Sequence, residues 1–179
     1  LLADDFRLLI PDLPGHGASS SALQNDLVSI AAALNCWLAA TESTPVALGG
    51  WSLGGMLALE MARQKPQRID RLLLIGTSPR FTSGDDWTFG LPEVQVRALG
   101  RSLARRFEAT LADFFNLAFA GEDISKERLR AIRSFAVKQS PLPDQVAAME
   151  LLKGFSEQNQ LDLLSHIDQP ALVIHGGLD

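Results

Sequence analysis

The sequence predicts an α/β fold in which a mostly parallel sheet is flanked by helices and carries a helical insertion. Short apolar runs at residues 46–50, 71–76 and 171–175 are continuous rather than alternating, which is typical of strands buried on both faces. Helical patterns alternate with the early runs, and this alternation favours parallel strands with helices on each side. A long, largely helical region precedes the last run, which indicates an insertion between two strands of one sheet.

The chain before residue 46 contains one predicted strand and one predicted helix. Residues 6–10 form a short apolar run that Pro11 closes, so we expect a buried strand followed by a loop. From residue 26 to about residue 40, apolar side chains recur at helical spacing, which predicts an amphipathic helix against the sheet. The single cysteine, Cys36, falls in this helix and cannot form an internal disulfide, so we expect a small buried hydrophobic side chain.

Residues 50–54 read Gly-Trp-Ser-Leu-Gly at the point where a strand pattern changes to a helix pattern. A reversal in so few residues places the serine in a strained backbone conformation, and we expect Gly50 and Gly54 to be glycines because larger side chains would collide there. The pattern predicts a nucleophile elbow with the Ser52 hydroxyl at its tip. The backbone N–H of Leu53 is then an oxyanion donor at the start of a helix whose dipole favours negative charge.

The region after Pro79 is helical. Apolar residues recur every three or four positions over residues 96–114 and 125–139, Asp144 can cap a third helix, and residues 161–167 add a turn. We interpret this block as a cap, or lid. The expected domains are an α/β core, residues 1–84 and 163–179, and a helical cap, residues 85–162.

Together these motifs resemble the α/β-hydrolase family. The matching segments are the loop at residues 12–19, the elbow at residues 50–55 and the strand and loop at residues 172–179. The resemblance implies a serine hydrolase whose nucleophile, acid and histidine follow in that chain order, with the acid after the strand that follows the cap. Asp179 occupies that place, so the resemblance implies that it orients the catalytic base.

The resemblance also implies two parts that this sequence does not contain. The second oxyanion donor is expected before residue 6, and the basic histidine is expected after Asp179. His16 lies in a loop read as structural, and His166 and His175 precede Asp179, so none of the three is expected to be the base. Because the chain also begins with Leu rather than Met, we expect an excerpt of a longer sequence.

Within the family, the elbow together with residues 77–81 and 85–87 resembles the methyl ester esterases of biotin synthesis. This resemblance implies a serine carboxylesterase that hydrolyses the methyl ester of a carrier-bound acyl chain through an acyl-enzyme on Ser52, with water as the cosubstrate and no cofactor. Two alternatives stay open. One is a general short-chain esterase or a carbon–carbon bond hydrolase of the same fold, and the other is a noncatalytic binding protein or an inert hydrolase fragment.

We expect the cap to choose the substrate. Five consecutive residues of one cap helix are candidates to line an acyl pocket beside Trp51, although each could equally belong to the packed interior of the cap. These candidates are Phe114, Phe115, Asn116, Leu117 and Ala118.

A basic surface is expected on the second cap helix. Lys126, Arg130 and Arg133 lie at positions i, i+4 and i+7 and therefore share a face. The neighbouring sequence is also basic, within a chain of net charge −5, and contains Arg97, Arg101, Arg105, Arg106, Arg128 and Lys138. Such a face is suited to docking an acidic acyl-carrier protein or its phosphate, whereas the plain alternative is a solvated helix face.

Composition excludes several other classes of function. The 179 residues are 46% hydrophobic and 21% charged, which is typical of a soluble enzyme, and the negative net charge argues against a nucleic-acid binder. No apolar run approaches the roughly 20 residues of a membrane span, and no signal peptide is evident. No cluster of Cys and His suggests a metal site. We expect a cytoplasmic monomer that acts on a small ester.

Overall fold

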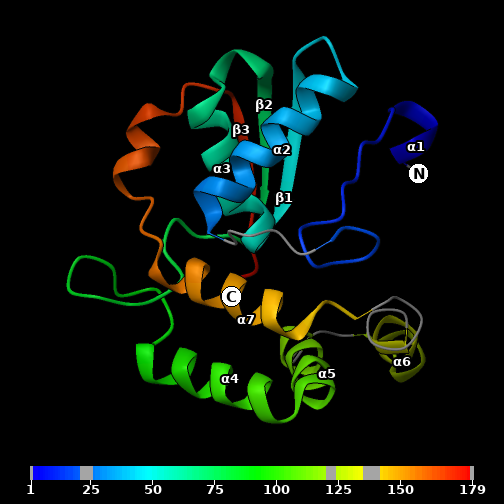
Figure 1. The fold of residues 1–179 in the computed structure, drawn as a ribbon, viewed down its shortest axis with the longest axis vertical. Coiled ribbons are helices and arrows are strands. Elements are labelled where there is room, and N and C mark those ends of the chain that lie inside the picture. Colours follow the sequence, from blue (N-terminus) through cyan, green and yellow to red (C-terminus); the bar gives the residue numbers. More distant parts are fainter. Residues whose placement is uncertain (1, 21–25, 120–123, 135–141, 178–179) are drawn as a thin grey trace.

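A computed structural model describes residues 2–20, 26–119, 124–134 and 142–177 of the chain. Its centre is a parallel sheet of three strands in the order β1-β2-β3. The strands are β1 (Val46–Trp51), β2 (Ile69–Ile75) and β3 (Ala171–Ile174). Trp51 pairs with Ile75, which pairs with Ile174, so the three carboxyl ends lie at one edge of the sheet. This edge faces the helical group that runs from α4 (Glu93–Arg105) to α7 (Gln145–Glu157) (Figure 1).

Two helices, α2 (Leu27–Thr41) and α3 (Leu53–Gln64), cover one face of the sheet (Figure 1). The continuous buried stretch of α3, from Gly55 to Ala62, forms the centre of the core between α2 and the strands. Among the described residues no helix covers the opposite face, and the side chains of β3 are exposed. The α/β class with a parallel sheet is therefore confirmed. The expectation of strands buried on both faces is wrong for the described chain, because β1 alternates between half-buried and exposed residues, β2 is buried only in part, and β3 is exposed.

Helix α2 follows the predicted amphipathic pattern. The Asp26 carboxylate caps it by accepting from the Ser29 N–H at 3.0 Å. The hydrogen bond from the Ser29 hydroxyl, and after it the one from the Ser29 N–H, lowers the pKa of Asp26. Asn35 faces α3 and donates to the Met61 carbonyl. Cys36 is exposed, which contradicts the expectation of a buried thiol, because the next position along a helix is rotated away from the packed stripe.

The expected strand at residues 6–10 is not formed. These residues follow a short helix, α1 (Leu2–Asp5), and pair with no described strand, while the side chains of Phe6 and Ile10 are 62% and 83% exposed. Their apolar pattern is strand-like, but backbone N–H and C=O groups adopt a strand only beside a neighbour that accepts their hydrogen bonds.

The helical group contains α4 (Glu93–Arg105), α5 (Phe107–Ala118), α6 (Lys126–Arg133) and α7 (Gln145–Glu157), and it lies beyond the carboxyl edge of the sheet (Figure 1). The apolar repeat over residues 96–114 spans two helices, because the chain breaks at Arg106 (φ −144°, ψ 58°) without interrupting the spacing. This break is a correction to the expected single helix.

The helix expected over residues 125–139 is described as α6 over Lys126–Arg133, and residues 135–139 lie outside the described part of the chain. The predictions for the helix after Asp144 and for the turn at residues 161–167 are confirmed. Asp144 caps α7 by accepting from the Ala147 N–H at 2.9 Å. The turn expected at residues 161–167 is the short 3-10 helix η3 (Asp162–His166), which leads back to β3, and another such turn, η1 (Pro66–Arg68), joins α3 to β2. In the described parts of the chain, no helix has both the length and the apolar character that crossing a membrane requires.

Candidate active site

Ser52 lies between the end of β1 and the first residue of α3, as the sequence predicts for a nucleophile elbow. Its φ of 52° and ψ of −119° make it the one described non-glycine residue with a positive φ. A conformation of this kind costs about 1–3 kcal/mol and persists only where its surroundings enforce it. Here the Ser52 N–H donates to the Ile75 carbonyl at 2.9 Å, and the Thr77 hydroxyl donates to the Ser52 carbonyl at 2.7 Å.

The glycines around Ser52 have different roles from those expected. A Cβ on Gly50 would lie 2.1 Å from the backbone carbon of Gly54, which confirms that a side chain at Gly50 would collide. A Cβ on Gly54 would meet nothing within 4 Å, so the expected collision there is wrong. The next residue carries that constraint instead, because a Cβ on Gly55 would lie 2.5 Å from the Thr77 side chain. The repeated glycine after Leu53 was the sequence signal for it.

The amino end of α3 supplies the predicted oxyanion donor. Leu53 is the first residue of the helix, so its N–H has no carbonyl partner within the helix, and the helix dipole places partial positive charge at the same end. The Ser52 side chain beside it is half-buried. The turn can therefore present a hydroxyl and an N–H donor to the same reacting group.

Trp51 precedes Ser52 on β1 and is 54% exposed. Because side chains alternate along a strand and Gly50 faces α3, Trp51 points to the opposite face of the sheet. Trp51, Ser52 and Leu53 are the predicted site residues that the structure holds together in one turn.

The end of β3 reaches the same edge of the sheet as Ser52. The strand ends at Ile174, two strands away from β1 and level with Trp51 and Ile75, and His175 follows it. The predicted acid, Asp179, lies outside the described residues. The structure therefore places the segment that leads to Asp179 at the edge where Ser52 lies.

Among the described residues no histidine ring is hydrogen-bonded to the Ser52 hydroxyl. The Nδ1 atom of His16 lies 2.9 Å from the Pro14 carbonyl, and that of His166 lies 3.1 Å from the Asp162 carbonyl. His175 is exposed at the end of β3. That none of the three serves as the base remains a prediction.

The candidate acyl-pocket residues lie on α5 in the helical group. The rings of Phe114 and Phe115 contact edge to face with centroids 5.7 Å apart, and Phe114 and Leu117 are 44% and 75% exposed. Asn116 and Ala118 are also exposed. In the described chain no hydrogen bond or ring contact joins this part of α5 to the elbow.

The candidate docking residues lie on α6, which Ser125 caps by accepting from the Arg128 N–H at 3.2 Å. Lys126 and Arg130 are exposed. The side chain of Arg133 is not among those the structure describes, and Lys138, which we counted in the basic region, also lies outside the described residues. Helix α6 lies at the outer end of the helical group (Figure 1).

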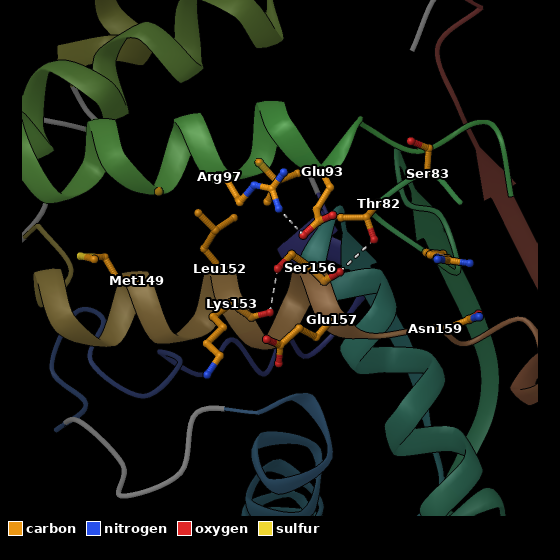
Figure 2. Close-up of a pocket in the computed structure, with 13 residues that line it drawn as sticks. Thr82, Ser83, Glu93, Arg97, Met149, Leu152, Lys153, Ser156, Glu157 and Asn159 are labelled. Carbon is orange, nitrogen blue, oxygen red and sulfur yellow. Dashed lines mark hydrogen bonds and ion pairs between the residues drawn. The ribbon is translucent and has the colours of Figure 1, made fainter. Parts of the chain in front are cut away.

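A cavity of about 480 Å³ lies between α4 and α7, and its lining includes Arg97 of the predicted basic region but not Trp51, Ser52 or the candidate residues on α5. Figure 2 shows its lining, including the ion pair between Arg97 and Glu93 and the hydrogen bond from Thr82 to Ser156. Arg80, also in the lining, pairs with Asp86. The pKa of the Asp86 carboxyl is lowered, first by its own backbone N–H and then by Arg80.

In the described parts of the chain no group of three or more His, Cys, Asp or Glu side chains is arranged to hold a metal ion. The pKa is shifted at Asp26, Glu42, Arg63 and Asp86, and Ser52 is not among the causes of any of these shifts. The local chemistry of the elbow is therefore that of a hydroxyl and backbone N–H groups at a helix terminus.

Comparison with known proteins gives a family match over the whole chain. The family described as alpha/beta hydrolase fold matches residues 1–179. A pimeloyl-[acyl-carrier protein] methyl ester esterase of Nitrosospira multiformis is 31% identical over 99% of this chain and 68% of its own length. The enzyme of the same name from Chromobacterium violaceum is 32% identical over 99% of this chain and 67% of its own length.

Solved structures share the fold. An esterase from Exiguobacterium antarcticum aligns with a TM-score of 0.83 at 22% identity, covering 94% of this chain and 62% of that one. A hydrolase from Pseudomonas aeruginosa aligns with a TM-score of 0.76 at 25% identity, covering 98% of this chain and 63% of that one. The chain thus spans less than two thirds of the length of these structures.

Proposed function

The chain belongs to the α/β hydrolase fold family, and from this premise we propose that it carries the nucleophile of a serine carboxylesterase that cleaves a methyl ester. The observation that carries the proposal is the backbone of Ser52, held at φ 52° between the end of β1 and the amino end of α3. A serine that serves only in a turn has no need of this strained position, whereas a nucleophile needs its hydroxyl exposed beside an oxyanion donor.

The reaction divides into two steps at Ser52. The hydroxyl oxygen attacks the ester carbonyl while a histidine takes its proton, and the tetrahedral intermediate then expels methanol and leaves an acyl-enzyme. Water next attacks the acyl-enzyme, releasing the carboxylic acid and restoring the hydroxyl. We propose that the Leu53 N–H donates to the oxyanion, an interaction worth about 3 kcal/mol of barrier for one donor.

We propose Asp179 as the acid that orients the histidine and stabilises its positive charge. Its support is the position of β3, whose carboxyl end lies at the sheet edge of Ser52. The basic histidine is expected after Asp179 in the chain order of the family, and the second oxyanion donor is expected before residue 6.

The proposed substrate is the methyl ester of an acyl chain bound to an acyl-carrier protein. The support is the name shared by relatives 31% and 32% identical to this chain, pimeloyl-[acyl-carrier protein] methyl ester esterase. Carrier-bound substrates of this kind are biosynthetic, so the proposal places the protein in the cytoplasm, and a monomer suffices because the proposed site uses one chain.

We propose that residues 85–162 act as the cap that selects this substrate. The α5 segment Phe114–Ala118, with Trp51, is the proposed acyl pocket, and its support is the exposure of apolar side chains beyond the carboxyl edge of the sheet. Lys126, Arg130 and Arg133 are the proposed docking face for the acidic carrier, supported by the exposure of Lys126 and Arg130 on α6.

The proposal is tested by intact-mass spectrometry of the complete natural protein before and after incubation with a serine-reactive fluorophosphonate. We expect a single adduct that maps to Ser52 and is absent in Ser52→Ala. Hydrolysis of a carrier-bound methyl ester is then compared with that of free p-nitrophenyl esters. Absence of the adduct overturns the proposed nucleophile. Activity on free esters without preference for the carrier-bound ester supports a general esterase instead.

A further inference from the structure

The chain leaves the sheet for the helical group and returns from it at two segments that lie against each other. We call residues 79–82 and 155–160 the clasp. The rings of Phe81 and Phe155 stack with centroids 4.1 Å apart, and Arg80 and Asn159 form an antiparallel bridge. The Thr82 hydroxyl donates to the Ser156 carbonyl at 2.9 Å, as Figure 2 shows at one end of the cavity.

Gln160 connects the clasp to the elbow helix. Its backbone N–H donates to the Pro79 carbonyl at 2.8 Å, which ties the returning segment to the departing one. Its side chain is fully buried, and Nε2 donates to the Met56 carbonyl at 2.9 Å. Met56 lies in the first turn of α3 and is 1% exposed. A residue of the cap connection therefore binds directly to the helix that begins at the nucleophile.

The hydrogen bonds of Gln160 complete a closed network of contacts that includes Ser52. The Ser52 carbonyl accepts from the Met56 N–H at 3.4 Å and from the Thr77 hydroxyl at 2.7 Å. Thr77 precedes Pro79 by two residues, and Gln160 holds both Pro79 and Met56. This network links the first turn of α3 to the loop after β2 through the buried side chain of Gln160.

The interior position of Gln160 makes this link specific. Its Oε1 atom is buried and has no hydrogen-bond partner among the described residues, so the amide is oriented by the donation from Nε2 to Met56. Burying an amide of which only one end is paired is unfavourable, and a plain core position favours an apolar side chain of the same size. The contact with α3 is the feature of this position that an apolar residue cannot reproduce.

We propose that Gln160 is a positioning residue for the nucleophile, which holds the first turn of α3 so that the Ser52 hydroxyl and the Leu53 N–H keep their relative orientation. The inference rests on the proposed function, because it requires Ser52 to react. Gln160 touches no reacting atom and acts through Met56. Displacement of a reacting group by about 1 Å can lower a rate by about 100-fold, so a small rotation of this turn is sufficient to affect catalysis.

The test compares Gln160→Met with Thr82→Val in the complete natural protein. Both replacements remove a buried side-chain donation to a backbone carbonyl of the described chain, but only Gln160 bonds to α3. Three quantities are measured: the second-order rate of fluorophosphonate labelling at Ser52, and kcat and KM for the carrier-bound methyl ester. Circular dichroism and the melting temperature establish that each variant is folded at the assay temperature.

We expect Gln160→Met to lower kcat and the labelling rate together by about 10-fold or more, with KM within about twofold of the wild type. Thr82→Val is expected to leave the labelling rate unchanged. If Gln160→Met does not fold, Gln160→Asn carries the same expectation, because its shorter side chain retains the amide but does not reach Met56.

Three results overturn the proposal for Gln160: labelling at the wild-type rate, equal slowing in both variants, or a rise in KM with kcat and labelling unchanged. Equal slowing would mean that the clasp supports the fold in general. These results differ from failure of the proposed function, in which the wild-type protein itself is not labelled at Ser52.

Discussion

The elbow at Ser52 and the basic helix α6 differ in how tightly the chain holds them. Ser52 is bound through its own N–H and carbonyl to β2 and the loop that follows it, and it opens a helix whose residues from Gly55 to Ala62 are buried. Helix α6 has eight residues, a Ser125 cap and exposed Lys126 and Arg130 side chains. The first region is held by packing and by hydrogen bonds to other elements, whereas the described side chains that are proposed to act on α6 are exposed.

This difference corresponds to what each region is proposed to do. Attack on an ester requires atoms placed to within a fraction of an ångström, which only a packed and hydrogen-bonded environment provides. Attraction of an acidic carrier acts over about a Debye length and tolerates movement of long side chains. Substitutions should therefore have large, salt-independent effects at the elbow and modest, salt-dependent effects on α6.

Removing the nucleophile should produce the largest effect. We expect Ser52→Ala to lower kcat by about 10⁵- to 10⁶-fold, because a triad without its nucleophile keeps only binding and the oxyanion site. The free energy of unfolding should change by less than about 1 kcal/mol, since the backbone contacts of residue 52 remain. Steady-state kinetics and chemical denaturation measure the two quantities. Substantial remaining turnover would show that another group is the nucleophile.

Alanine substitutions at the two glycines of the elbow, Gly50 and Gly54, should differ strongly in their effect on the free energy of unfolding. We expect Gly50→Ala to lower the free energy of unfolding by about 3 kcal/mol or more, since its Cβ would lie 2.1 Å from the backbone of Gly54. Gly54→Ala should be neutral or stabilise by up to about 1 kcal/mol, because nothing lies within 4 Å and alanine favours a helix. Urea denaturation of both variants checks the pair, and equal losses would contradict it.

Charge reversal on α6 should affect only the carrier-bound substrate. Arg130→Glu combined with Arg133→Glu is expected to raise KM for the carrier-bound ester about 10-fold at low salt, with a smaller effect at high salt, and to leave a free ester unaffected. Lys65→Glu, an exposed reversal at the end of α3, is the matched control and should change neither KM. Equal losses on carrier-bound and free esters would rule out the docking role.

Relief of the backbone strain at Ser52 should raise the free energy of unfolding. Ser52→Gly is expected to raise the free energy of unfolding by about 1 kcal/mol relative to Ser52→Ala, because glycine adopts a φ of 52° without penalty. Both variants lack the hydroxyl, so the comparison isolates the backbone. Equal stability of the two would mean that residue 52 carries no strain.

The cap of α2 should make a pH-dependent contribution to stability. The lowered pKa of Asp26 means that its ionised form stabilises the folded state, so this contribution is complete above its unfolded pKa of about 3.9 and is lost as pH falls through the lower folded value. We expect Asp26→Ala to lower the free energy of unfolding by about 1 kcal/mol at pH 7 and by progressively less in acid.

The cap of α6 is the comparison. Ser125→Ala should leave the global melting temperature unchanged, and a loss of stability equal to that of Asp26→Ala would place α6 in the cooperative core.

The elbow was predictable because its signals are local. Gly50, Ser52 and the strand-to-helix change lie within a few residues, and their conformation follows from sterics at neighbouring positions. The assignment of the collision to Gly54 failed because the atom that limits Gly55 belongs to Thr77, on the loop after another strand. Spacing within one segment contains no information about that contact.

The helices were also largely predictable, and the exceptions have physical causes. Periodicity predicted α2 and α7, and Asp26 and Asp144 cap them as side-chain acceptors. It did not reveal the break at Arg106, because the apolar spacing continues through it. The run at residues 6–10 has strand composition, but strand formation depends on a partner that composition cannot supply.

The sequence by itself determined the α/β class, the parallel strands, the elbow with Ser52 and Leu53, and the family, since each depends on short-range patterns or on residues that match a known motif. Only the tertiary structure decided which glycine must stay small beside Thr77 and that Gln160 joins the cap connection to the first turn of α3. The physical reason is separation along the chain. Gln160 and Met56 are 104 positions apart, and only the folding of the sheet and its cap brings their atoms within hydrogen-bond distance.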